Sequence, residues 1–342
     1  MFTYFIRRFL LIIPTFLVAT IVVFVVLQFT PGGPLEQIEL QAKMQMMQKG
    51  GEAGGSGGSG RSDLEIPEQS KEELKRYFNL DKPVPIRYLN WLGNILTGEF
   101  GKSYIYSEPV LDVVAQRLPI SLQFGLTGFL LTYLICIPLG IYKAVRHGSG
   151  FDLISSAIVF IGYSIPGWAL GAVLLVMLGG TWFPLGEFQS SGWEYMDLWG
   201  KIVDRAHHAV LPTIAYMAGG FATLTILMKN SLLENLGQDY VRTAFAKGLS
   251  ERRVIFVHTL RNSLIPIATG LGHALGLILT GSLFIERVFN IDGMGFMGYR
   301  SIIERDYTLF MGVLVIGLLL SLTGNIFSDM LYAATDPRIR FR

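Results

Sequence analysis

The sequence is short of charge. Of its 342 residues, 16% are charged and 51% are hydrophobic, whereas ordinary soluble domains carry about 25% charged residues. It also has a single cysteine, Cys136, which excludes an internal disulfide and gives no information on the redox compartment. We expect Cys136 to pack in an apolar core. The composition excludes an ordinary soluble domain and indicates an integral membrane protein.

Six apolar runs are long enough to cross a bilayer, which takes roughly 20 residues for a helix. They cover residues 9–29, 119–142, 153–178, 209–228, 264–285 and 309–331. We therefore predict an all-α, multi-pass fold with six transmembrane helices. The first run is longer than the core of a secretion signal, and no small-residue cleavage pattern follows it. We expect it to be retained as a signal-anchor.

Ionisable residues are scarce inside these runs. The first four contain no acidic residue and no histidine; the fifth contains His273 with Glu286 at its outer end, and the sixth contains Asp329. Ion-coupled carriers and membrane enzymes usually place such groups near the bilayer centre, so neither class is favoured. His273 either lines a substrate path or packs between helices. His207 and His208 are adjacent, so their side chains point different ways, and we predict no metal site.

A phosphate-binding loop is also missing. Gly101-Lys102-Ser103 resembles the end of a P-loop, but that motif needs an earlier glycine where this sequence has Leu96. No strand precedes it either. We predict no nucleotide site and no enzymatic activity in this chain, so active transport would require a separate ATPase.

The distribution of basic residues predicts the orientation. They cluster before the first run, between the second and third, between the fourth and fifth, and at the end of the chain: Arg7 and Arg8, Lys143 and Arg146, the stretch 229–261, and Arg338, Arg340 and Arg342. With six crossings all four clusters fall on one side, which the positive-inside rule makes cytoplasmic. We thus expect both termini in the cytoplasm. The net charge of +2 gives no reason to expect a nucleic-acid partner.

Residues 30–112 form the predicted extracytoplasmic insertion. It contains a Gly/Ser linker at 50–60 that composition makes flexible, whether natural or engineered. A capping-box pattern at Ser70 predicts one helix, and the apolar residues from Tyr88 to Leu96 predict a second, amphipathic one. These helices contact lipid headgroups or a soluble partner, or pack against the chain's own spans.

The most informative segment is a hydrophilic loop at 230–263. Asp239 can cap a helix start, Gly248 suits the left-handed position that ends it, and Ser250 can cap the next helix. Four apolar residues then recur at helical spacing before Pro266: Val254, Val257, Leu260 and Leu264. A loop that only returned the chain to the membrane would not need two helices and a glycine turn.

Small residues and prolines shape the predicted spans. Gly167-x3-Gly171 and Gly272-x3-Gly276 let helices approach closely, or serve plain packing. Pro166 should kink the third run. Such helices suit a pathway that opens to alternate sides of the membrane, and we predict that these residues contribute to it: Tyr163, Ser164, Pro166, Gly220, Thr223, His273 and Phe284.

The loop resembles the cytoplasmic coupling loop of ABC importer permeases, and residues 113–332 are similar to a type I permease domain, with 1–29 as an added N-terminal helix and 333–342 as a tail. Further motifs narrow the resemblance to the first permease of dipeptide and oligopeptide importers, most like the microcin C and oligopeptide subgroup: Pro31-Gly32-Gly33-Pro34, Leu80-Asp81-Lys82-Pro83, Gly98-Glu99-Phe100-Gly101 and Asp336-Pro337-Arg338. Arg242-Thr243-Ala244 stands where many type I permeases have Glu-Ala-Ala, as in the peptide branch.

The resemblance implies a function and its partners. The chain would be one permease subunit of an ATP-driven peptide importer in the bacterial cytoplasmic (inner) membrane, embedded in lipid. It would pair with a second homologous permease, an ATPase whose two domains are separate or fused and bind ATP and Mg²⁺, and an extracytoplasmic peptide-binding protein. No cofactor is expected in this chain. The residues implied in ATPase coupling are Asp239, Tyr240, Arg242, Thr243, Ala244, Ala246, Lys247, Gly248 and Leu249. The alternatives are an ion-coupled secondary transporter and a membrane-embedded enzyme.

Overall fold

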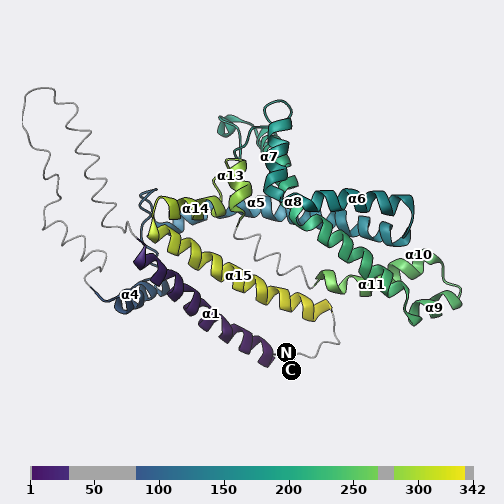
Figure 1. The fold of residues 1–342 in the computed structure, drawn as a ribbon. Coiled ribbons are helices and arrows are strands. Elements are labelled where there is room, and N and C mark those ends of the chain that lie inside the picture. Colours follow the sequence, from purple (N-terminus) through teal and green to yellow (C-terminus); the bar gives the residue numbers. More distant parts are fainter. Residues whose placement is uncertain (1, 31–81, 269–280, 336–342) are drawn as a thin grey trace, which may run out of the picture. The chain divides into compact units, whose positions relative to one another are not determined.

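The computed structural model describes residues 2–30, 82–268 and 281–335. The expected linker at 50–60, the helix at Ser70, His273, the glycine pair 272–276 and most of the tail lie outside these residues. In the described part the fold is helical (Figure 1). Its first helices are α1 (Phe2–Phe29), α4 (Val84–Leu96), α5 (Val110–Val145), α6 (Gly150–Ser164), α7 (Gly167–Leu178), the short 3₁₀ helix η1 (Trp193–Tyr195) and α8 (Leu198–Leu236).

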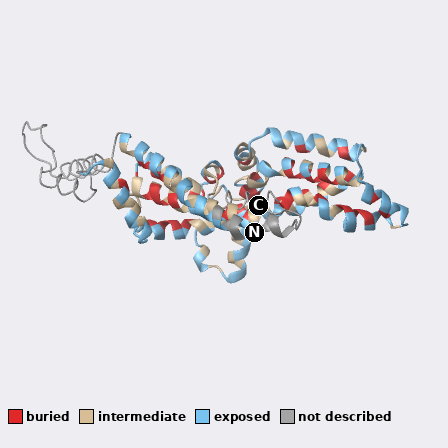
Figure 2. Ribbon diagram, turned by 90° about the horizontal axis from the view of Figure 1, so that it is seen from below, coloured by how far each residue is buried: buried red, intermediate tan, exposed pale blue. Residues whose placement is uncertain are grey.

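The remaining elements follow the hydrophilic loop. They are α9 (Asp239–Ala246), α10 (Glu251–Arg253), the π-helix η2 (Val254–Thr259), α11 (Leu260–Ser263), α13 (Leu283–Val288), α14 (Met294–Ile303) and α15 (Tyr307–Thr335). Residues pack in two compact units: Met1–Ile12, Val114–Met297 and Ile316–Arg342 in the first, Ile13–Val113 and Gly298–Val315 in the second. Buried residues run along the helices in stripes, with exposed residues on other faces (Figure 2).

Four described helices are long and apolar enough to cross a membrane: α1, α5, α8 and α15. They match the first, second, fourth and sixth predicted spans. The third span is bent by 96° between α6 and α7, and the break falls at Ile165 and Pro166, which cap the two helices. The chain does bend at Pro166 as predicted, but the bend is a break between two helices and not a kink within one. Residues 269–280 of the fifth predicted span lie outside the described residues.

Close packing of α7 on α8 depends on glycine. A Cβ on Gly167 would overlap the carbonyl oxygen of Ala215, and one on Gly171 would lie 3.0 Å from the Ala215 Cβ and 2.9 Å from the Phe289 ring. These contacts belong to a core built on Phe124, Leu211 and Phe289. The expectation that small residues let these helices approach is confirmed for this pair.

A second core lies further along α5 and α8. Cys136 is fully buried there with Met228 and Leu232, and its thiol donates a hydrogen bond to the Phe221 carbonyl at 3.3 Å. The single cysteine is thus a packing residue, as predicted. His207 and His208 bond to different oxygens, the carbonyls of Trp182 and Asp204, so their side chains do diverge.

In the second unit, α4 packs against α1. Tyr88 makes an edge-on contact with Phe24, with ring centroids 5.5 Å apart, and its hydroxyl lies 3.0 Å from that of Thr20. Trp91 completes the aromatic group. The amphipathic helix predicted at Tyr88–Leu96 is confirmed, and of the alternatives left open for it, packing on the chain's own first span is the one seen.

The Gly101-Lys102-Ser103 segment binds a carboxylate of the same chain. Asp306 accepts hydrogen bonds from the Ser103 hydroxyl at 2.7 Å and from the backbone N–H groups of Tyr104 and Ile105 at 2.6 and 3.0 Å. Its other oxygen caps α15 by accepting from the Leu309 N–H. Burial raises the pKa of Tyr104, and the neighbouring charge of Asp306 raises it further. The anion bound by this loop is therefore the Asp306 carboxylate of the same chain.

Gly167→Ala tests the close packing of α7 on α8. The added methyl group overlaps backbone, and we expect a loss of roughly 1–3 kcal/mol, typical of overpacking, seen as a lower Tm in detergent. Gly162→Ala is the matched control, because no atom lies within 4 Å of its Cβ position and alanine favours a helix over glycine by up to about 1 kcal/mol. Equal Tm values for the two variants would contradict the packing argument.

Candidate functional site

The hydrophilic loop forms a helical hairpin beyond the end of α8 (Figure 1). Helix α9 ends in a Schellman motif: the Gly248 N–H bonds to the Phe245 carbonyl at 2.9 Å and the Leu249 N–H to the Ala244 carbonyl at 3.4 Å. Gly248 has φ 77°, the left-handed conformation that glycine adopts without steric cost. The glycine turn expected from the sequence is confirmed.

The structure differs from the expected loop at Asp239, Ser250 and Val257. The residue that caps α9 is Gln238, without a side-chain bond, and Asp239 is already inside the helix. Ser250 does occupy the cap position of α10, but its hydroxyl makes no capping bond. Val257 is exposed rather than on the apolar face. The cause is the π-helix η2, where the Thr259 hydroxyl donates to the Val254 carbonyl five residues back at 3.0 Å, so the buried face continues from Val254 to Thr259 and Ser263.

The nine residues assigned to coupling divide into two sets. Ala244 is buried and Leu249 half-buried, and both pack with Val241 and Val254 inside the hairpin. The others are exposed: Asp239, Tyr240, Arg242, Thr243, Ala246, Lys247 and Gly248. Arg242 forms an exposed ion pair with Asp239 at 3.6 Å, which solvent screens. The hairpin therefore has its own apolar core and presents a polar surface outward.

A buried charge cluster lies at the same end of α8. Asp152 accepts two hydrogen bonds from the Lys229 ammonium, at 2.7 and 2.8 Å. Lys143, 1% exposed, lies 3.3 Å from the same carboxylate and donates to the hydroxyls of Ser155 and Ser156 at 2.6 and 2.8 Å. The Gly148 N–H adds a bond at 3.1 Å. One carboxylate thus ties α5, α6 and α8 together.

Sequence reasoning missed this cluster. Asp152 lies one residue before the predicted third span, so it was not among the acidic residues counted within the spans. In the structure it belongs to α6. The available signal was the pairing of Lys143 and Asp152 across a short turn between two apolar runs. A charge so close to the end of a span needs a partner.

A second buried carboxylate, Glu286, lies at the start of α13. It accepts hydrogen bonds from the Ser121 hydroxyl and from the Phe296 N–H, each at 2.7 Å, and the Tyr216 hydroxyl lies 3.5 Å away. Backbone approaches it closely, because a Cβ on Gly281 or Gly293 would overlap its side chain. Ser121 also accepts from the Met294 N–H. Glu286 and Ser121 together satisfy N–H groups in the first turn of α14.

A cavity of about 650 Å³ lies between α5, α7, α8 and α13. Three of the predicted path residues line it: Gly220, Thr223 and Phe284. Tyr163, Ser164 and Pro166 do not line it; they are exposed at the bend between α6 and α7. Aromatic residues that the sequence did not single out complete the wall: Phe129, Tyr133, Trp168 and Tyr216. Tyr216 and Thr223 are seven residues apart, so both lie on the same face of α8. That spacing could have identified Tyr216 as a lining residue.

The cavity wall carries no ionised side chain among the described residues that line it. It combines aromatic rings with glycines and a few hydroxyls, and Trp168 and Phe284 face each other with ring centroids 6.0 Å apart. Such a surface can contact an amide backbone and varied side chains weakly, without selecting one charge.

Comparisons with known proteins agree with this geometry. Residues 136–341 match the family model described as binding-protein-dependent transport system inner membrane component. The chain belongs to this family. It is 39% identical to the peptidoglycan transport system permease protein YejB of Agrobacterium fabrum, covering 99% of this chain and 98% of that protein. It is 35% identical to the oligopeptide transport system permease protein AppB of Bacillus subtilis, with full coverage of both.

Dipeptide permeases are also among the relatives. The dipeptide transport system permease protein DppB of Escherichia coli is 30% identical over the full length of both chains. Among solved structures, an inward-facing MetNI methionine ABC transporter matches with a TM-score of 0.53 and 19% identity, covering 67% of this chain and 99% of that one. That likeness shows the fold. The predicted family and its type I permease core are thus confirmed.

Asp152→Asn tests the charge cluster. The variant leaves Lys143 buried without a counter-ion, and breaking a buried pair in this way costs roughly 3–5 kcal/mol. We expect a markedly lower Tm in detergent. Asp239→Asn is the matched control, since its exposed pair with Arg242 is worth about 0–1 kcal/mol. A Tm loss no larger than that of the control would contradict the role given to Asp152.

Proposed function

We propose that this chain is one of two membrane-spanning subunits of an ATP-driven importer of peptides. The observation that carries the proposal is the exposed helical hairpin α9–α10, built on the Gly248 turn, in a chain whose relatives are named as permeases for oligopeptides, dipeptides and peptidoglycan. The uncharged cavity beside α8 supports it, because a conduit for varied peptides has to avoid strong binding. The chain is not an enzyme in this proposal.

The exposed face of the hairpin docks on the ATPase. Arg242 and Lys247 supply the charge and Tyr240 an aromatic surface, while Ala244 and Leu249 act from inside by holding the turn. ATP and Mg²⁺ bind to the ATPase, whether its two domains are separate chains or one. Movement of the hairpin reaches the spans through α8, because the Asp152 cluster joins α8 to α5 and α6 near the hairpin.

The cavity forms this subunit's half of the translocation path. A second, homologous permease supplies the other half, and an extracytoplasmic binding protein supplies affinity for the peptide. Gly220, Thr223 and Phe284 line the path. Tyr163, Ser164 and Pro166 join it at the bend between α6 and α7, and His273 remains a proposed member. The microcin C and oligopeptide subgroup is the proposed source of substrates.

Both termini lie in the cytoplasm, and the protein spans the bacterial inner membrane. Arg8 near the start of α1 forms an ion pair with Asp329 near the end of α15, which supports an even number of crossings. The basic clusters then lie inside, together with the hairpin. Six spans satisfy this count if α6 and α7 form one crossing and residues 264–285 supply another.

Reconstitution tests the driving force. In liposomes, this chain with its second permease, ATPase and binding protein should concentrate peptide only when ATP is supplied on the ATPase side. The chain alone should not do so, because a weakly binding, uncharged cavity has no energy source. Labelled peptide uptake is the measurement, with a non-hydrolysable ATP analogue as control. Uptake driven by a proton gradient without ATP would overturn the proposal.

Gly248→Val tests the hairpin. A β-branched residue is strongly disfavoured at positive φ, by at least about 1 kcal/mol, so we expect the turn to shift and peptide-stimulated ATP hydrolysis to fall several-fold while membrane insertion is kept. Gly237→Val is the matched control, because Gly237 ends α8 at φ −76°, which any residue adopts. If both variants keep full coupling, the hairpin is not the docking element.

A further inference from the structure

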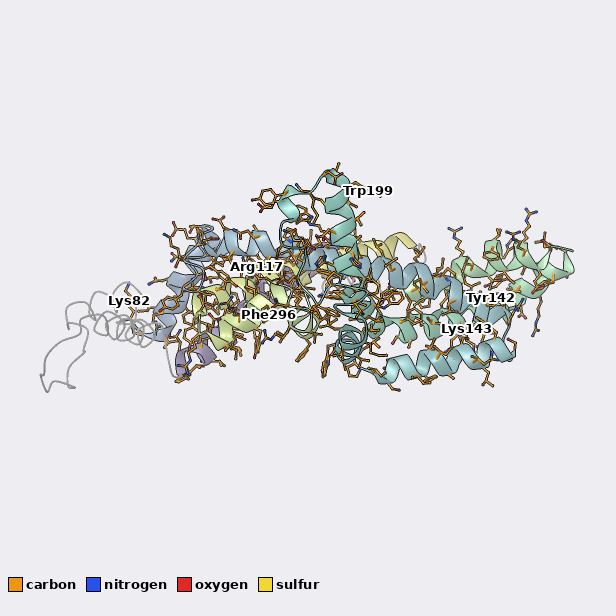
Figure 3. All side chains as sticks on the ribbon, turned by 90° about the horizontal axis from the view of Figure 1, so that it is seen from above. Lys82, Arg117, Tyr142, Lys143, Trp199 and Phe296 are labelled. Carbon is orange, nitrogen blue, oxygen red and sulfur yellow. The ribbon has the colours of Figure 1, made fainter. Side chains whose placement is uncertain are left out.

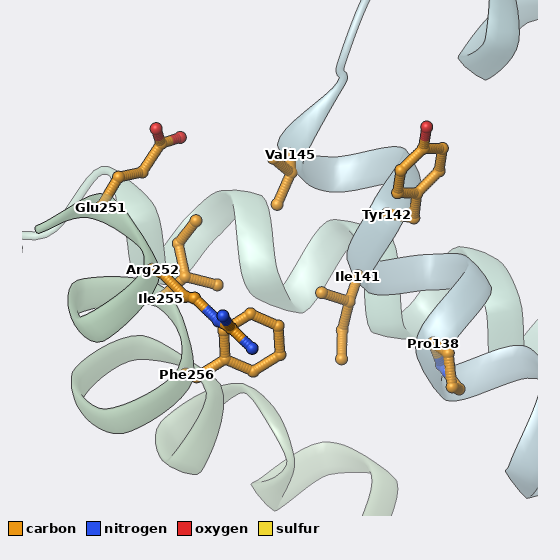
Figure 4. Close-up of a pocket in the computed structure, with 8 residues that line it drawn as sticks. All are labelled: Pro138, Ile141, Tyr142, Val145, Glu251, Arg252, Ile255 and Phe256. Atoms are coloured by element: carbon orange, nitrogen blue, oxygen red, sulfur yellow. The ribbon is translucent and has the colours of Figure 1, made fainter.

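An apolar groove of about 480 Å³ lies between the last turns of α5 and the elements that follow the Gly248 turn (Figure 4). Pro138, Ile141, Tyr142 and Val145 form one wall, Ile255 and Phe256 the other, and Glu251 and Arg252 stand at its edge. Tyr142 and Lys143 are neighbours on α5 (Figure 3), but Lys143 turns inward to the Asp152 cluster and Tyr142 faces the groove.

The inner part of the groove belongs to the apolar run 119–142, which we predict to cross the membrane. From Val145 to Pro138 is seven residues of α5, or roughly 10 Å along the helix axis, and these residues belong to a helix apolar enough to span a bilayer. A soluble ATPase cannot follow α5 into the hydrocarbon. Tyr142, Val145 and Phe256 are 41%, 43% and 53% exposed, so apolar surface on both walls requires a cover.

The edge of the groove carries unneutralised positive charge. The Arg146 guanidinium lies 4.7 Å from the centre of the Tyr142 ring, and Arg252 reaches over the apolar wall beside Phe256 (Figure 4). Within the described part of the chain neither arginine has an ion-pair partner. Glu251 offsets one of the two charges, which leaves one net positive charge at the edge. That charge matches a single phosphodiester.

We propose that this groove binds an anionic phospholipid of the cytoplasmic leaflet. An acyl chain lies along Pro138, Ile141 and Phe256, and the headgroup phosphate bonds to Arg252 and Arg146 at the level of the membrane surface. Guanidinium groups suit this task because they bond phosphate through two N–H groups at once. The bound lipid fills the space between α5 and the segment following the coupling hairpin. The inference rests on the proposed orientation of the chain, not on transport.

Native mass spectrometry of the purified full chain tests the site. After equilibration with equal amounts of phosphatidylglycerol and phosphatidylcholine of the same acyl chains, we expect one phosphatidylglycerol to be retained in preference. Arg252→Ala should lower this preference about tenfold, as expected for a lost charge-assisted hydrogen bond. Arg253→Ala is the matched control: it removes a neighbouring charge that is also exposed but does not line the groove.

A second variant separates groove binding from charge attraction. Val145→Trp keeps every arginine and narrows the groove, so it should lower retention of phosphatidylglycerol as well. Free glycerol phosphate should not displace the lipid, because it lacks the acyl chain. Equal effects of Arg252→Ala and Arg253→Ala, or unchanged retention in both groove variants, would overturn the proposal. So would loss of the lipid on assembly with the second permease, which would show that the partner covers the groove. None of these readouts depends on ATP or peptide.

Discussion

The cost of burying charge constrains this structure most. Asp152 is placed where two lysines from α5 and α8 reach one carboxylate, with Lys143 fully buried. Removing either the carboxylate or the lysines would leave the remaining charge unpaired in a low-dielectric interior, at a cost of several kcal/mol. Because Lys229 lies only seven residues before the end of α8, the cluster lies close to the base of the hairpin that α9 and α10 form. Any movement of the hairpin must move α5 and α6 with it, or break the cluster.

The cavity differs from the Asp152 cluster, because no charged side chain lines it among the described residues. Glu286, next to the lining residue Ile285, is enclosed by Ser121, backbone N–H groups and glycines, so its oxygens have hydrogen-bond partners within the chain. The cavity wall is largely aromatic, with rings from Trp168, Tyr216 and Phe284. Among the described residues, charged groups thus serve the packing of helices and are absent from the cavity wall. This separation suits a cargo whose side chains vary, and it explains why affinity and energy would come from other subunits.

Local sequence signals predicted the features that depend on one or two residues. Gly248 at a helix end and Pro166 within an apolar run each have one favourable solution, and the structure contains both. Features that depend on distant partners were not predictable in this way. Asp152 pairs with Lys229 across 77 positions, and the exposure of Val257 follows from a π-helix that simple 3.6-residue periodicity does not anticipate. Gln238, not Asp239, is the cap because the helix begins one residue earlier than an Asp239 cap would require.

The π-helix connects these observations. By adding a residue to the turn, it keeps Val254 and Thr259 on the core side while rotating Phe256 and Val257 outward. Phe256, exposed in this turn, forms part of the wall of the groove beside α5 together with Ile255. The hairpin thus presents polar residues on its exposed face, while the segment that follows it adds apolar residues to the groove.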